Sequence, residues 1–424
     1  MNRRDFLQAA ALAATLGRIL GPLRVFAETP ATLGPWTPGT LDIHHLAYGR
    51  GNSTFILAPD GTTLLIDAGT NHDALDVSCA QKPNNNLRPG EWIASYILRH
   101  MQPVNRRDLD YALITHIHPD HLGDLVPGNS QDTPPSPKGN YRLTGITDVD
   151  ALVPIRTLID RGFPDYLYPQ QQQAPFALNH LAYVRTRQQQ GASTERIQVG
   201  SNKQIRLQRQ PSLYPQFEVR NLAANGEVWT GTGDQTRQTF PDINTLAPAD
   251  YPTENMCSIA LRLSYGNFRY FTAGDLTSDT EESGESWRDI ETPVALAAGP
   301  VDVAVADHHA YYDAVGPGFV RALSPRVFVI PSWYVAHPSV LPLRRMLSRQ
   351  LYPGDRDLYA TCVMPANRLV NNQFIDKLAS LEGHIIIRVA PGGREFRVLV
   401  TDNTDDQDRI KLVAGPFPTA PKTT

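Results

Sequence analysis

Cysteine is scarce in this chain, and its spacing does not suggest a thiolate metal site. Only Cys79, Cys257 and Cys362 occur in 424 residues, and no two of them form a CxxC pair. An odd count allows at most one disulfide and leaves one thiol over. The sequence therefore favours buried or loosely exposed thiols over a cysteine-held metal cluster.

An excess of basic residues is also missing. The formal net charge is −4, and residues 1–27 contribute +3 to it, which leaves −7 for the remainder. Tight, nonspecific binding of nucleic acids depends on Lys and Arg side chains that neutralise phosphates. We therefore expect a small-molecule substrate and no stable nucleic-acid partner.

Long apolar runs are absent after residue 27, since none approaches the ~18 residues needed to cross a bilayer. Within residues 1–27, Arg3 and Arg4 precede Phe6, an Ala-rich stretch follows, and Val25 and Ala27 offer small residues at a cleavage site. This segment resembles a twin-arginine signal peptide more than a Sec signal or an amphipathic helix. The resemblance implies the twin-arginine export machinery as a partner, a periplasmic or secreted location, and no membrane attachment after cleavage.

The rest of the chain reads as a short linker and one domain. Residues 28–40 are rich in Pro, Gly and Thr, as linkers often are. From residue 41 to residue 424, short β-type segments and helices follow each other without a break in composition, which predicts a single α/β domain. Strands are expected at 42–48, 53–58, 62–67, 111–114, 217–223, 257–263, 268–273, 301–306, 327–331, 384–389 and 396–400, and helices at 91–101 and 175–190.

Four side chains of metal-ligand type stand within six positions directly after an apolar strand. They are His116, His118, Asp120 and His121. His116 and His118 differ by two positions, so they project the same way from extended backbone. Pro119 stops the strand, and Asp120 and His121 then start a helix and point back into the same cleft. Imidazole and carboxylate groups suit Zn²⁺, and such a motif is far more specific than scattered histidines.

This HxHxDH cluster resembles the motif of the metallo-β-lactamase-fold hydrolases. Other segments resemble the branch related to the hydrolase domain of DNA-internalisation competence proteins, and they follow in the same order over residues 41–400. They are GRGN at 49–52, LIDAG at 65–69, NMCS at 255–258, AGD at 273–275, DHHA at 307–310 and AHP at 336–338. The resemblance implies a four-layer αββα sandwich and a metal-dependent hydrolase.

The same resemblance implies a role for each matching residue. His116 and His118 bind a first metal, and Asp120 and His121 bind a second. Asp275 bridges both ions. The second site is completed by His308 or, as the alternative, by His309. Asp67 orients ligands by accepting their hydrogen bonds.

The chain departs from the family pattern at the first metal, where most members have a third histidine. The only histidine between residues 121 and 308 is His180, which lies in a predicted helix and is interpreted as structural. The first metal then has two histidines plus the bridge, or it uses Asn255. His337 is a further candidate, for the rim of the cleft or for substrate contact. Asn52 replaces an Asp of the branch, which leaves its role open.

Together these residues predict hydrolysis by metal-activated water. One or two Zn²⁺ ions are expected, with Mn²⁺ or Fe as alternatives. Asp120 would orient the nucleophile or shuttle its proton. Three functions stay open: a hydrolase of small phosphoesters or phosphodiesters, favoured by the branch; a lactam or lactone hydrolase, favoured by export and acidity; and a non-catalytic metal-binding module.

Overall fold

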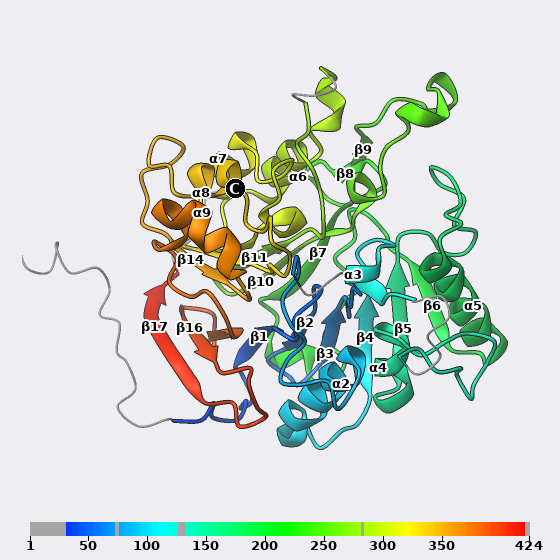
Figure 1. The fold of residues 1–424 in the computed structure, drawn as a ribbon, viewed down its shortest axis with the longest axis horizontal. Helices are drawn as coiled ribbons and strands as arrows, with labels where there is room; N and C mark the ends of the chain where they lie inside the picture. The colour runs from blue at the N-terminus through cyan, green and yellow to red at the C-terminus, as the bar shows by residue number, and fades with distance from the viewer. Residues whose placement is uncertain (1–30, 73–75, 126–131, 281–283, 420–424) are drawn as a thin grey trace, which may run out of the picture.

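Two β-sheets stand face to face, with helices on their outer sides (Figure 1). The computed structural model describes residues 31–72, 76–125, 132–280 and 284–419. The predicted signal peptide, residues 1–27, lies outside the described residues. In those residues one sheet has nine strands and the other has eight.

Each sheet is built from strands that are distant in sequence, so neighbours in space are often not neighbours along the chain. In spatial order, the nine-stranded sheet contains β17 (Ile410–Pro418), β16 (Glu395–Thr401), β15 (His384–Val389), β1 (Leu41–His45), β2 (Thr54–Leu57), β3 (Thr63–Ile66), β4 (Leu109–Leu113), β5 (Ile155–Asp160) and β6 (Ser193–Arg196). The eight-stranded sheet contains β14 (Asp357–Ala360), β13 (Val327–Ile330), β12 (Val303–Val305), β11 (Phe268–Thr272), β10 (Ala260–Tyr265), β7 (Phe217–Ala224), β8 (Glu227–Trp229) and β9 (Thr236–Gln238).

Helices fill the outer layers and short 3₁₀ turns join the elements. The α-helices are α2 (Pro89–His100), α3 (Pro119–Leu122), α4 (Ile146–Leu152), α5 (Pro175–Gln189), α6 (Glu291–Ala298), α7 (Pro317–Leu323), α8 (Val340–Met346) and α9 (Pro365–Ile375). The 3₁₀ turns are η1 (Gln102–Val104), η2 (Pro211–Leu213), η3 (Ile243–Thr245), η4 (Pro248–Asp250), η5 (Asn255–Cys257), η6 (Ser286–Arg288) and η7 (Asp307–Ala310).

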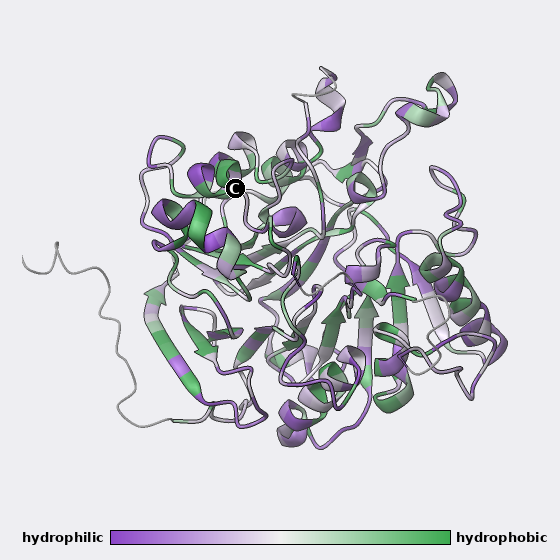
Figure 2. Cartoon of the chain, viewed as in Figure 1, coloured by the Kyte–Doolittle hydropathy of each residue, from purple (hydrophilic) through white to green (hydrophobic). Residues whose placement is uncertain are grey.

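Three apolar layers hold the four structural layers together. Side chains alternate along each strand, so Leu64 of β3 lies in the apolar layer between the sheets, while Leu65 lies in the outer layer that residues of α2, α4 and α5 share. In β13, Val327 packs between the sheets and Phe328 packs against α6, α7, α8 and α9. Figure 2 shows the strands as largely hydrophobic and the helices as mixed. The predicted four-layer αββα sandwich, formed as a single domain, is confirmed.

The predicted elements are present, with ends that differ from the prediction by at most three residues. Helix α2 begins at Pro89 rather than at residue 91, because proline fits the first helical position. The Glu91 carboxylate then accepts a hydrogen bond from the backbone N–H of Arg88 at 2.8 Å, which caps the helix. Local chemistry thus sets where this helix starts.

Residues 31–40, the described part of the predicted linker, lie against the domain. The backbone N–H of Leu33 donates to the carbonyl of Asp408 at 2.9 Å, and that of Gly39 donates to the carbonyl of Pro59 at 2.8 Å. The Trp36 side chain is buried and belongs to the apolar layer under the first sheet. This stretch is therefore anchored at several points.

Parallel strand pairs bring the predicted ligands to one edge of the two sheets. β3 pairs in parallel with β4, and β11, β12 and β13 run parallel in the second sheet. Asp67 follows β3, residues 115–121 follow β4, Asp275 follows β11 and His309 follows β12. A hydrogen bond from Ile259 N–H to the Thr115 carbonyl, at 2.9 Å, joins the two sheets at this edge.

A disulfide links loops from the two halves of the fold. It joins Cys79, between β3 and α2, to Cys362, directly after β14, across 283 residues of sequence. Cys257 is buried and stays a free thiol. The arrangement agrees with the single disulfide that three cysteines allow.

The disulfide leads to a stability prediction. Replacing Cys79 and Cys362 with Ser should lower the free energy of unfolding by about 2–4 kcal/mol, because the crosslink restricts the unfolded chain. Urea unfolding followed by tryptophan fluorescence would measure this difference. Dithiothreitol should destabilise the wild type and leave the double variant unchanged. Equal unfolding midpoints for wild type and double variant would contradict the prediction.

Candidate metal centre

The HxHxDH segment forms a sharp strand-to-helix turn. His118 is still extended, with φ −128° and ψ 155°, and Pro119 takes the first position of α3. Asp120, His121 and Leu122 complete that single turn, and Gly123 ends it with φ 115°, a backbone angle that glycine adopts without strain. The turn therefore places the strand residues and the helix residues around one space, as the spacing predicted.

Four of the predicted residues form one tight, buried cluster. Asp120, His121, Asp275 and His309 each offer a ligand atom, and these atoms all lie within 4.8 Å of one another. His121 Nε2 lies 3.1 Å from Asp275 Oδ1, and His309 Nε2 lies 2.9 Å from Asp120 Oδ2. Imidazole nitrogens and carboxylate oxygens at this density are the donor set of a zinc-type metal site.

Two buried atoms of the cluster make no hydrogen bond of good geometry. His121 Nε2 and Asp275 Oδ1 face each other at 3.1 Å, and neither bonds to any other residue that the structure describes. Buried polar atoms are almost always satisfied, and an ion is one of the few explanations for an exception. The cluster therefore fits a bound cation.

His116 and His118 stand on the other side of Asp275. His116 Nε2 lies 3.7 Å from Asp275 Oδ2 and 3.1 Å from His118 Nδ1. Asp275 thus contacts one histidine of the first pair and two histidines of the four-residue cluster. Its position suits the bridging role that the family resemblance implies.

Asp67 holds the turn and one ligand at the same time. Its carboxylate lies 2.8 Å from His121 Nδ1, and it accepts from the Thr115 N–H and hydroxyl, both at 2.8 Å. Asn52 donates to it through Nδ2 at 3.1 Å. A carboxylate on Nδ1 leaves His121 Nε2 for a metal, which is the orienting role predicted for Asp67. Asn52, whose role the sequence left open, supports that carboxylate.

The two histidines of η7 take different places. His309 joins the cluster, and its Nδ1 lies 2.8 Å from the Pro331 carbonyl. His308 lies beside the cluster: its Nδ1 is 2.7 Å from Asp313 Oδ1, and its Nε2 is 3.9 Å from Asp275 Oδ2. The prediction favoured His308, whereas the structure places His309 among the four closest ligand atoms. Both residues have left-handed backbone, with φ 43° and 53°, which turns the two rings apart.

His337 packs behind His309 instead of at an open rim. The two rings stack with centroids 4.9 Å apart and an interplanar angle of 22°. Only 5% of His337 is exposed. Trp333 contacts the same ring, with its indole N–H 3.5 Å from His309 Nε2. These aromatic groups form an apolar backing for His309.

The charges around the cluster leave the ligands ready for a cation. Burial lowers the pKa of His116 and His118, which keeps both imidazoles neutral. Burial opposes ionisation of Asp120 and Asp275, but His121 nevertheless lowers the pKa of both carboxyls. Neutral imidazoles and ionised carboxylates are the states that metal binding requires.

The pKa values of His121 and His309 are shifted in the opposite direction from those of His116 and His118. Burial lowers the pKa of His309, but the carboxylates of Asp275 and Asp120 outweigh it and raise the value to about 9. The pKa of His121 is likewise raised, with Asp275 as the largest cause after the opposing effect of burial. The carboxylates thus attract positive charge, which a bound metal ion would supply in place of these protons.

The remaining histidines lie in other environments. His180 occupies helix α5, and its Nε2 lies 3.1 Å from Asp160 Oδ2. His72 pairs with Asp124 at 3.2 Å. Several others, interpreted from the sequence as residues without ligand context, sit near Tyr96 in the layer beneath the first sheet; they are His44, His100 and His384.

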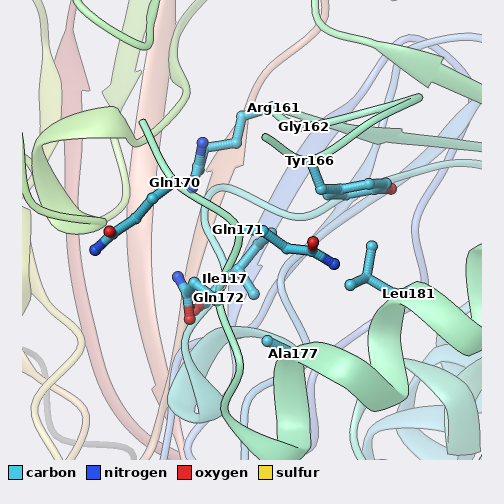
Figure 3. A pocket seen from close by; sticks show the side chains of 9 residues that line it. All are labelled: Ile117, Arg161, Gly162, Tyr166, Gln170, Gln171, Gln172, Ala177 and Leu181. Atoms are coloured by element: carbon cyan, nitrogen blue, oxygen red, sulfur yellow. The ribbon is translucent and has the colours of Figure 1, made fainter. Parts of the chain in front are cut away.

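The residues that brace the HxH turn were not predicted from the sequence. Glu254 Oε1 accepts a hydrogen bond from Ile117 N–H at 2.7 Å, and Arg161 Nε donates to the same oxygen at 2.6 Å. Gln172 Nε2 donates to the Ile117 carbonyl at 3.2 Å. Figure 3 shows Ile117 and Gln172 side by side, below Arg161. Glu254 stands next to Asn255, but nothing in the sequence signals a contact with residue 117.

The bracing of His121 gives a prediction on metal affinity. Asp67→Asn should lower Zn²⁺ affinity about 10- to 100-fold, because an amide cannot accept from all the donors that face this carboxylate. Competition with a chromophoric chelator would measure the change. A metal content and affinity equal to the wild type would contradict the role of Asp67.

Matched variants control for general destabilisation. His180→Gln also removes a buried histidine that contacts a carboxylate, yet it should keep the metal content of the wild type. The double variant His116→Ala/His118→Ala should lose at least one metal equivalent. Full occupancy in the double variant, measured by elemental analysis, would refute the assignment of these two ligands.

The similarity to a known family covers the first half of this site. Residues 47–127 match the family model described as the Metallo-beta-lactamase superfamily, and they include Asp67 and the HxHxDH segment. No curated protein matches the chain. Asp275 and His309 lie outside the matched residues, so their place in the site rests on the geometry above. The match and the two-sheet architecture show that this chain has the metallo-β-lactamase fold, with a candidate metal-binding cluster of which Asp120 and His121 lie in the matched segment.

Proposed function

We propose that the protein is a hydrolase that uses metal-activated water. The buried cluster of Asp120, His121, Asp275 and His309 carries this proposal, because it gathers the ligand types of a catalytic metal site at one edge of both sheets. The superfamily match supports a metal-dependent hydrolase-type function. Imidazole and carboxylate donors suit Zn²⁺, and Mn²⁺ or Fe are alternatives.

The metal and Asp120 would have different roles in the reaction. When bound, the metal lowers the pKa of water from 15.7 to about 7 and polarises the scissile group. Asp120 lies 2.9 Å from His309 and 3.7 Å from His121, so its carboxylate is held between two ligands. From there it would orient the attacking water and accept its proton.

We propose a small phosphoester or phosphodiester as the substrate. The resemblance to the competence-protein branch supports a phosphoryl group. A polar groove of about 430 Å³ would admit it; Arg50 and His72 line the groove, and so does Arg88, which is paired with Asp148 and Glu91. Arg50, in its lining, is two residues from Asn52, whose N–H donates to the Asp120 carbonyl at 2.8 Å. The overall acidity of the chain argues against a long nucleic acid.

A lactam or lactone hydrolase is the second candidate. Arg161 lies beside the HxH turn. Two nitrogens of its guanidinium group donate to the Glu254 carboxylate. Its charge is therefore neutralised within the protein, which favours a neutral carbonyl substrate at this side of the site. A non-catalytic metal-binding module is the remaining alternative, and turnover of any ester separates it from the two enzymes.

The substrate proposal predicts the result of a three-way screen. Purified protein should slowly cleave a chromogenic phosphodiester in a metal-dependent manner, and Asp120→Ala should abolish that cleavage. A chromogenic cephalosporin and an acyl-homoserine lactone are measured beside it, with His180→Gln as the control variant. Clear preference for either of these two would replace the phosphoester with the second candidate.

We also propose export through the twin-arginine route to the periplasm or beyond. Arg3 and Arg4 support the route, and the Cys79–Cys362 disulfide supports an oxidising compartment. Among the described helices, none combines the length and apolar character needed to cross a membrane.

Export is predicted to depend on the arginine pair. Changing Arg3 and Arg4 to Lys should leave uncleaved precursor in the cytoplasm, because the twin-arginine machinery recognises this pair. Fractionation and immunoblotting of a bacterial host would show it, with Arg18→Lys as a matched substitution outside the pair. Normal processing of the double variant would exclude the route.

A further inference from the structure

The first metal pair, His116 and His118, has no third histidine. His180 is the only histidine between residues 121 and 308, and its Nε2 contacts Asp160 instead. A structural zinc-type site has four protein ligands and a catalytic one has three plus water. Two histidines and the shared carboxylate make three protein ligands, so one position of a four-coordinate ion is open to water or to a further protein donor.

Asn255 presents an oxygen with the required properties. Its Nδ2 lies 3.2 Å from His308 Nε2, while His308 Nδ1 lies 2.7 Å from Asp313 Oδ1. The Asn255 amide nitrogen is thus engaged by His308. The amide orientation is thereby fixed, and Asn255 Oδ1 is left buried without a hydrogen bond from any described residue.

Asn255 also lies at the correct side of the site. The preceding residue, Glu254, accepts a hydrogen bond from Ile117 N–H, and Ile117 stands between His116 and His118. On the other side, His308 Nε2, which contacts the Asn255 amide, is 3.9 Å from Asp275 Oδ2. His116 Nε2 is 3.7 Å from that same oxygen. Asn255 is thus tied both to the HxH turn and to the bridging carboxylate.

We propose that Asn255 Oδ1 is a protein ligand of the first metal, in the place of a third histidine. His308 and Asp313 orient its amide and are positioning residues. This inference rests on the metal-binding part of the proposed function and is independent of the substrate. It gives the unsatisfied oxygen a cation as its partner.

The proposal makes the two metal sites unequal. The second site has two carboxylates and two imidazoles, whereas the first has two imidazoles, a shared carboxylate and a neutral amide oxygen. An amide oxygen is a harder donor than imidazole and binds Zn²⁺ less readily. The first site should therefore fill after the second and should discriminate less strongly between Zn²⁺ and Mn²⁺.

Metal titration of the full-length chain tests this directly. Metal-free protein is titrated with Zn²⁺ and with Mn²⁺ by calorimetry, with circular dichroism as a check on folding. The wild type should show two classes of site. Asn255→Ala should weaken the lower-affinity class at least 10-fold and leave the higher-affinity class within 2-fold. The control variant His180→Gln should leave both classes within 2-fold.

A variant that gains Zn²⁺ affinity separates loss of a ligand from loss of folding. Asn255→His restores a third imidazole and should tighten the lower-affinity Zn²⁺ class, which misfolding cannot do. In the wild type, Asp313→Asn should weaken that class about 10- to 100-fold, because it releases His308. In the Asn255→His background, the same Asp313→Asn change should leave the affinity unaltered. Two unchanged classes in Asn255→Ala would overturn the proposal even if hydrolysis is found. Absence of hydrolysis with these affinity changes would instead reject only the proposed activity.

Discussion

The buried carboxylate of Asp275 is the constraint on which the site depends. Only 2% of this residue is exposed, and a charge removed from water is costly unless other groups compensate it. Compensation comes from histidines of both sheets: His116 and His121 follow β4, and His309 follows β12. The two sheets must therefore meet in one register at this edge. Within each sheet the parallel strands end at this side, and the hydrogen bond from Ile259 N–H to the Thr115 carbonyl joins the two sheets there.

The polar groups around the ligands form a connected network whose net charge differs between the two metal sites. Around the second site, Asp67 and Asp120 add negative charge beside His121 and His309, and this charge attracts a cation. Around the first pair, Glu254 is neutralised by Arg161, so the bracing of Ile117 adds no net charge. A network in low dielectric is stabilising only when every member is satisfied. The asymmetry in charge is thus a property of the surrounding groups as much as of the ligands.

Local patterns were sufficient where a residue's role follows from its position at a strand end. The HxHxDH turn and most strands could be placed in this way, whereas Asp67, Asp275 and the layer order were predicted from the family resemblance. Contacts between distant segments could not. The pairing of Glu254 with Ile117 spans 137 residues, and the left-handed backbone that separates the rings of His308 and His309 leaves no mark in composition. Short or edge strands such as β14 and β17 also lacked a clear alternating pattern.

The wall behind His309 shows why the site and the fold are coupled. Trp333 and His337 pack on the His309 ring, and the Trp333 carbonyl accepts a hydrogen bond from Cys79 N–H at 2.8 Å. Val335 N–H donates to the Val77 carbonyl at 2.7 Å, and the disulfide fixes the same loop to the end of β14. A segment of the first half therefore supports a ligand of the second half. Since the ligands come together only when both halves are closed, the free energy of metal binding is also free energy of folding.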